Sequence, residues 1–160
     1  MRLYTVTFVA VSVTAAQELF YLKPAADKPI KLHGIELSNV GGTADAGDAQ
    51  EELLRVEFIR LPATVTVGSG GTAPTPNPVL PNDVAAGFTA RANDTVLATT
   101  SGTALTMGAT GLNIRQPTPY TPPPEWRLVC ANAQALVARL NTAPNDPVLV
   151  SGTAWVEELV

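Results

Sequence analysis

Strand-length segments rich in Val, Thr and Leu alternate along this chain with proline and glycine, of which its 160 residues contain 14 and 12. Both residue types disrupt helices, and proline also lacks the backbone N–H that a central strand needs. Many short strands separated by such turn signals are typical of a β-sandwich or a β-barrel. The sequence therefore predicts an all-β fold.

The length fits a single domain that covers residues 1–160 and is large enough to bury a core without disulfides or metal ions. The arrangement that best fits the strand spacing is an antiparallel β-sandwich, jelly-roll-like, with long Pro/Gly-rich loops. Its one cysteine excludes an intrachain disulfide.

Charge is scarce and mildly acidic, with a formal net charge of −4 and a pI near 4.9. Without a basic surface to contact phosphate backbones, we expect no nucleic-acid partner. Charged residues make up 15% of the chain, against roughly 25% in a typical globular domain, and hydrophobic residues make up 46%. A surface this poor in charge favours contact with other proteins.

No segment approaches the roughly 18 unbroken apolar residues of a membrane span, so we expect no membrane partner. Residues 1–15 superficially resemble a secretory signal, with Arg2 followed by an apolar stretch. Threonine and serine interrupt that stretch, and its β-branched alternation fits a strand better than a signal helix.

Strands are predicted where apolar residues alternate or cluster between turn signals. The predicted ranges are 3–13, 18–23, 30–38, 51–61, 64–67, 87–92, 95–99, 104–107, 125–130, 135–141 and 148–158. Within 30–38 the apolar parity switches between Leu32 and Ile35, which predicts a β-bulge at Gly34. The first and last strands are both strong, and we expect them to pair with Val6 near Val156.

Little in the sequence suits catalysis, because His33 and Cys130 occur once each and far apart. We therefore expect no enzyme activity, no catalytic residues, no metal site and no cofactor. Cys130 alternates with Trp126 and Leu128, which predicts a buried thiol on the same strand face. The acidic residues Asp45, Asp48, Glu51 and Glu52 offer oxygen ligands for calcium, but their spacing departs from known calcium loops and favours a solvated loop.

Two proline-rich stretches, 68–83 and 116–124, are the best interface candidates, because a backbone stiffened by proline loses less entropy on docking. Tyr120 lies between prolines of the second stretch and is the better candidate for stacking on a ligand. Trp126 and Trp155 fit sheet core or a subunit contact better than a ligand site. The interface candidates are Pro74, Pro76, Pro78, Pro81, Tyr120 and Trp155.

Four segments, 28–38, 49–58, 135–146 and 150–159, resemble small structural proteins encoded among the head genes of tailed bacteriophages and prophages. The resemblance lies in residue texture and strand order and extends from Ile30 to Leu159. It implies a jelly-roll capsid decoration protein, also called a cement or auxiliary head protein. Such a protein is made in the cytoplasm of the bacterial host, binds the major capsid protein as a homotrimer, and stays on the capsid surface of the virion.

Two other functions fit the same sequence. One is a lectin-like or receptor-binding jelly roll that uses Tyr120 and loop residues to bind glycans or a host surface. The other is a different head or tail-fibre component of a phage, because those proteins reuse the same architecture.

Overall fold

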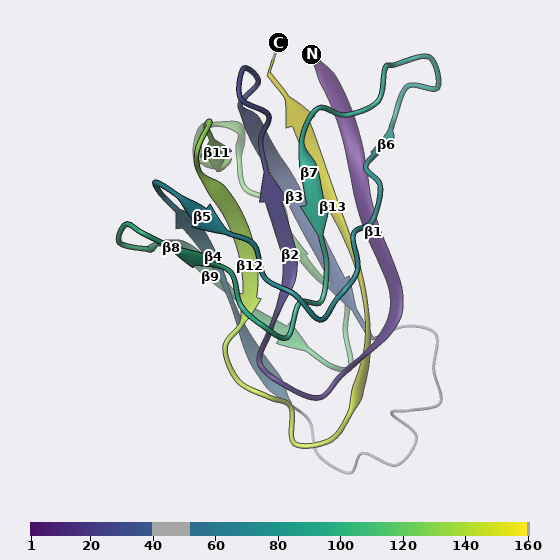
Figure 1. Cartoon of the computed structure of the whole chain (residues 1–160). Helices are drawn as coiled ribbons and strands as arrows, with labels where there is room; N and C mark the ends of the chain where they lie inside the picture. The colour runs from purple at the N-terminus through teal and green to yellow at the C-terminus, as the bar shows by residue number, and fades with distance from the viewer. Residues whose placement is uncertain (40–51, 160) are drawn as a thin grey trace.

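The computed structural model describes residues 1–39 and 52–159, which form two antiparallel β-sheets packed face to face (Figure 1). This confirms the predicted all-β antiparallel sandwich. The first sheet, named the β13 sheet after its central strand, has the order β10-β3-β13-β1-β6, and β11 also pairs with β3. Its strands are β1 (Arg2–Val13), β3 (Ile30–Ser38), β6 (Asn77–Pro78), β10 (Thr118–Tyr120), β11 (Val129–Cys130) and β13 (Val148–Glu158).

The second sheet, the β12 sheet, has the order β7-β2-β12-β4-β9. Its strands are β2 (Gln17–Lys23), β4 (Leu53–Leu61), β7 (Thr89–Arg91), β9 (Leu105–Asn113) and β12 (Ala135–Leu140). Two further short strands, β5 (Val65–Thr66) and β8 (Thr99–Thr100), pair with each other as a separate ribbon. The described residues also contain one 3₁₀ turn, η1 (Pro124–Trp126).

The first and last strands pair along nearly their whole length, as expected from the sequence (Figure 1). Val6 lies opposite Ala154, and Tyr4 lies opposite Val156. Alternate residues of both strands are buried, because one face of this sheet packs on the core. The side chains of β13 between them point outward; they are half-buried, including Trp155, except for the buried Glu157.

The predicted bulge in β3 is present. Trp155 lies opposite Gly34 whereas Val156 lies opposite Leu32, so His33 is the extra residue. A second bulge interrupts β1, where Val9 and Ala10 oppose one residue of β13. There the Ala10 N–H donates to the Ser151 hydroxyl at 2.9 Å. A bulge changes the direction of the side chains around it. Both bulges are in strands of the β13 sheet, so they change which side chains its outer face presents.

The core fills the space between the two sheets with large apolar side chains from both. Phe8 of β1 packs on Phe20 of β2 with ring centroids 5.1 Å apart. A Cβ atom on Gly152 would lie 2.6 Å from the Phe8 ring, so glycine at this inward position makes room for the phenylalanine.

The strand predicted over 125–130 is wrong in its first half. The chain forms η1 there, with the Trp126 N–H donating to the Pro123 carbonyl at 2.9 Å. Proline is favoured in the first turn of a helix, and three consecutive prolines end at Pro124. Leu128 and Cys130 are buried as predicted, but Trp126 is 73% exposed and does not share their environment.

The outer face of the β12 sheet is covered by the segment that carries β5 and β8. Tyr21, Ile59 and Val137 of the sheet pack there against Ala98 and Val65. The cover is fastened by polar contacts, because the fully buried Glu18 accepts hydrogen bonds from the Ala98 N–H at 3.0 Å and from the Arg139 guanidinium at 2.5 Å. Burial raises the pKa of Glu18 although Arg139 opposes this. The cover is partial, because Leu53 of β4 and Leu105 of β9 remain exposed on the β12 sheet.

Replacing Arg139 with leucine is expected to lower the free energy of unfolding by about 3–5 kcal/mol at pH 7, because it leaves the Glu18 carboxylate buried without its counter-charge. The loss should shrink as the pH falls and Glu18 takes up a proton, since the raised pKa favours the protonated folded state. Urea denaturation at several pH values measures both effects. Arg55→Leu on β4, where the side chain is 66% exposed, is the control and should change little; equal losses in the two variants would contradict the assignment.

Candidate functional site

The six interface candidates from the sequence all lie in or beside the β13 sheet. Pro78 is on β6 at one edge, Tyr120 is on β10 at the other edge, and Trp155 is on the central strand. Pro74, Pro76 and Pro81 belong to the loop that flanks β6. The fold thus gathers residues that are far apart in the sequence into one sheet.

Residues 72–86, named here the proline loop, contain the edge strand β6 and lie beside β1. The Val79 N–H donates to the Leu3 carbonyl at 2.8 Å, and the Tyr4 hydroxyl donates to the Val84 carbonyl at 3.1 Å. Between and beside these anchors the loop exposes three apolar side chains, with 47% of Val79, 60% of Leu80 and 54% of Val84 accessible. The loop therefore presents apolar side chains on a backbone that is fixed at several points.

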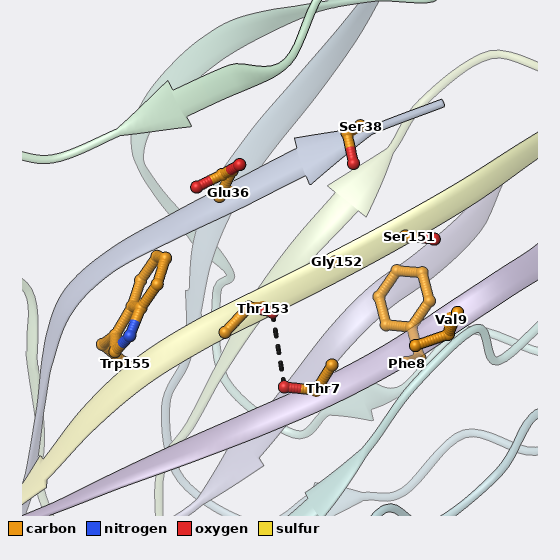
Figure 2. A pocket seen from close by; sticks show the side chains of 9 residues that line it. All are labelled: Thr7, Phe8, Val9, Glu36, Ser38, Ser151, Gly152, Thr153 and Trp155. Atoms are coloured by element: carbon orange, nitrogen blue, oxygen red, sulfur yellow. Dashed lines mark hydrogen bonds between the residues drawn. The ribbon is translucent and has the colours of Figure 1, made fainter. Parts of the chain in front are cut away.

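The outer face of the β13 sheet is hollowed beside Trp155, as Figure 2 shows. The hollow has a volume of about 410 Å³ and lies over β1, β13 and β3. Its polar lining consists mainly of hydroxyl groups, and the Thr7 and Thr153 hydroxyls lie 3.3 Å apart. The lining residues are Thr7, Phe8, Val9, Glu36, Ser38, Ser151, Gly152, Thr153 and Trp155.

A second hollow, of about 370 Å³, also borders Trp155. It is lined by Leu3, His33, Gly34, Thr121, Arg127 and Trp155. Gly34 is the cross-strand neighbour of Trp155 and has no side chain to fill the space between the strands. Trp155 is thus shared by two hollows of one sheet face, which we name the Trp155 face.

One end of this face carries a compact group of charges. His33 Nε2 donates to Glu157 Oε2 at 2.6 Å, and Lys31 Nζ lies 3.5 Å from the same oxygen. Burial alone would raise the pKa of Glu157, but the hydrogen bond from His33 and the charge of Lys31 hold it below its ordinary value of 4.5. The Arg127 Nε atom is buried and has no hydrogen-bond partner among the described residues.

Tyr120 does not lie in an exposed loop. Its ring stacks on Phe58 of the opposite sheet, with centroids 4.1 Å apart and an angle of 28° between the planes. Burial raises the pKa of its hydroxyl. The sequence signal that was missed is edge pairing: Tyr120 lies opposite the inward-facing Ile35, and an edge strand tolerates the neighbouring Pro119.

The remaining sequence candidates fall outside this face. Cys130 is fully buried, and burial raises the pKa of its thiol to about 12. Asp45, Asp48 and Glu51 lie outside the described residues. The buried Glu52 accepts a hydrogen bond from the Asn145 N–H at 2.8 Å, so this carboxylate holds a backbone segment. Across residues 1–39 and 52–159, no group of three or more His, Cys, Asp and Glu side chains is placed to hold a metal ion.

No protein-family model, curated protein or solved structure matches the chain. Among the described residues, no helix is long and apolar enough to cross a membrane. Two features of the β13 sheet stand out for their chemistry: the exposed apolar side chains of the proline loop and the hollowed Trp155 face.

Replacing Glu157 with glutamine is expected to lower the free energy of unfolding by about 1 kcal/mol at pH 7, because the pair with His33 loses its charge. The difference from the native protein should disappear as the pH falls through the pKa of the native Glu157 carboxyl, which lies below its ordinary value of 4.5, because that carboxyl then becomes protonated too. Thermal or urea unfolding between neutral and acid pH measures it. Glu36→Gln on the same face serves as the control, since Glu36 is exposed; a deficit that persists in acid would contradict this assignment.

Proposed function

We propose that this protein is a virion structural protein, a capsid decoration protein that binds the outer surface of a phage head as a homotrimer and stabilises it. Its partner is the major capsid protein, and its location is the capsid surface after synthesis in the bacterial cytoplasm. It acts through binding energy alone, without catalysis, cofactor or nucleic acid.

The strand order supports a jelly roll as the specific type of sandwich. The longer strands β1, β3 and β13 lie in one sheet, and β2, β4, β9 and β12 lie in the other. The chain therefore passes to the opposite sheet at each step from β1 through β4, and again from β12 to β13. A jelly roll, built from two Greek keys, interleaves its sheets in this way.

The observation that carries the proposal is the proline loop. It is held to β1 by hydrogen bonds on either side of Leu80, and its apolar side chains remain exposed. A stiff loop loses little conformational entropy when it docks. Fully burying one such side chain against a partner contributes at most about 1.5–3 kcal/mol. A few of them, repeated in each copy of a trimer, supply a substantial binding energy.

Decoration requires only such contacts. A protein that bridges neighbouring shell subunits stabilises the shell, because separating those subunits must also break the added interface. The low charge of the chain, 15% of its residues, suits a surface that spends much of its area against other proteins.

The first test measures mass by size-exclusion chromatography with light scattering at two protein concentrations, followed by binding to phage heads assembled without this protein. We expect a mass near three chains, saturable binding, and heads that withstand higher temperature when decorated. A monomer without affinity for the shell would refute the proposal.

The double variant Val79→Asp/Leu80→Asp should weaken shell binding by about tenfold or more, because charged side chains cannot be buried there without loss. The control is Leu53→Asp on β4 of the other sheet, where leucine is 73% exposed. Sedimentation of heads with bound protein measures both variants. Equal binding by the double variant and the native protein would show that the proline loop does not face the shell.

A further inference from the structure

Trp155 separates two hollows whose linings differ in chemistry. On one side the lining offers the hydroxyls of Thr7, Ser38 and Thr153 together with the exposed carboxylate of Glu36. On the other side it offers Thr121, His33 and the guanidinium of Arg127. An aromatic ring flanked by a few convergent polar groups is the usual composition of a small-molecule site.

The local backbone creates this arrangement. The bulge in β3 brings both His33 and Gly34 to the hollow beside Trp155. A Cβ atom on Gly34 would lie 2.8 Å from the Tyr120 carbonyl oxygen, so the close approach of β10 requires glycine at this position. Gly34 thus lines the hollow beside the indole with backbone alone.

Arg127 gives the second hollow its preference for charge. Its Nε–H is buried and unpartnered among the described residues, although a buried donor normally finds an acceptor. Glu157, a carboxylate on the same sheet face, is already paired with His33 and Lys31. Among the described residues the Arg127 guanidinium also forms no ion pair, so its charge remains available to a carboxylate that enters the hollow it lines.

We propose that the Trp155 face binds a saccharide that contains hexuronate units. The apolar C–H face of one sugar ring packs against the indole, and its carboxylate pairs with Arg127. The hydroxyl-lined hollow on the other side of Trp155 holds the adjoining unit, whose hydroxyls donate to Glu36 and exchange hydrogen bonds with the threonine and serine hydroxyls. This activity goes beyond capsid binding, and it engages the sheet face whereas the shell engages the proline loop.

The lining favours a sugar over a protein surface. Hydroxyl groups act as both donors and acceptors, which matches the hydroxyls of a sugar. The two hollows are shallow and of similar size, about 410 and 370 Å³, and they lie on either side of one indole. Adjacent units of a short oligosaccharide fit that spacing, whereas a protein hot spot is typically a dry pocket for one apolar anchor.

The test uses tetragalacturonate, tetramannuronate and the methyl ester of each, titrated into the full-length protein. Calorimetry measures affinity, and tryptophan fluorescence in a Trp126→Phe background reports on Trp155 alone, since the chain has two tryptophans. We expect saturable binding of at least one hexuronate tetramer with a change in Trp155 emission. Its methyl ester should bind about tenfold more weakly, because the charge-assisted bond to Arg127 is lost.

Substitutions of Arg127 and Trp155 test separately what each residue contributes to the affinity. Arg127→Met should reduce affinity for the acid to that for the ester, and Arg55→Met, an exposed arginine of the other sheet, should leave it unchanged. Trp155→Ala should abolish binding of both compounds, with circular dichroism to check its fold. If that variant does not fold, the proposal is still tested by comparing Arg127→Met with Arg55→Met and the acid with its methyl ester.

Three outcomes would overturn the proposal. They are no saturable binding of either hexuronate, equal affinity for acid and ester, or equal losses in the two arginine variants. If binding is absent and Trp155→Ala also lowers the mass of the native assembly, the Trp155 face is a contact between copies of the chain instead. Shell binding by the native protein is measured separately, so failure of one proposal does not affect the other.

Discussion

The antiparallel pairing of β1 with β13 is the contact on which the rest of this structure depends. It joins the two strands along nearly their whole length and leaves each with one further neighbour, β6 beside β1 and β3 beside β13. The proline loop is held in place because β6 pairs with β1. The Trp155 face exists because β3 lies on the other side of β13. Both proposed binding surfaces are thus positioned by one strand pair.

The two sheets differ in how far their outer faces are covered. Each buries one face in the core, and part of the outer face of the β12 sheet is also covered, by a segment that the buried Glu18 and its partner Arg139 hold in place. A buried ion pair contributes little net stability and is better understood as fixing one arrangement of the cover. The Trp155 face of the β13 sheet has no such cover among the described residues, so its two hollows remain open.

Features with a strong local pattern could be predicted from the sequence. The alternation in residues 148–158 and the parity switch between Leu32 and Ile35 both reflect one buried sheet face, and they correctly placed β13 and the bulge. Features that depend on a distant partner could not. Trp126 alternates with Leu128 as in a strand, but three preceding prolines favour a 3₁₀ turn, and Tyr120 is drawn inward by Phe58. The two hollows beside Trp155 combine residues from distant parts of the chain, such as Thr7 and Glu36 in one and Gly34 and Arg127 in the other, so no local pattern predicts them.

The strand order also sets when each sheet can be completed during synthesis. The central strands of the two sheets, β12 and β13, are the last two strands along the chain. Until they leave the ribosome, β1 and β3 have no strand between them, and neither do β2 and β4. Before β12 and β13 are synthesised, the edges of β1 to β4 that pair with them are therefore open, and contacts of such long sequence separation form slowly. Late completion of both sheets is thus a consequence of the topology that gathers the two proposed binding surfaces on one sheet.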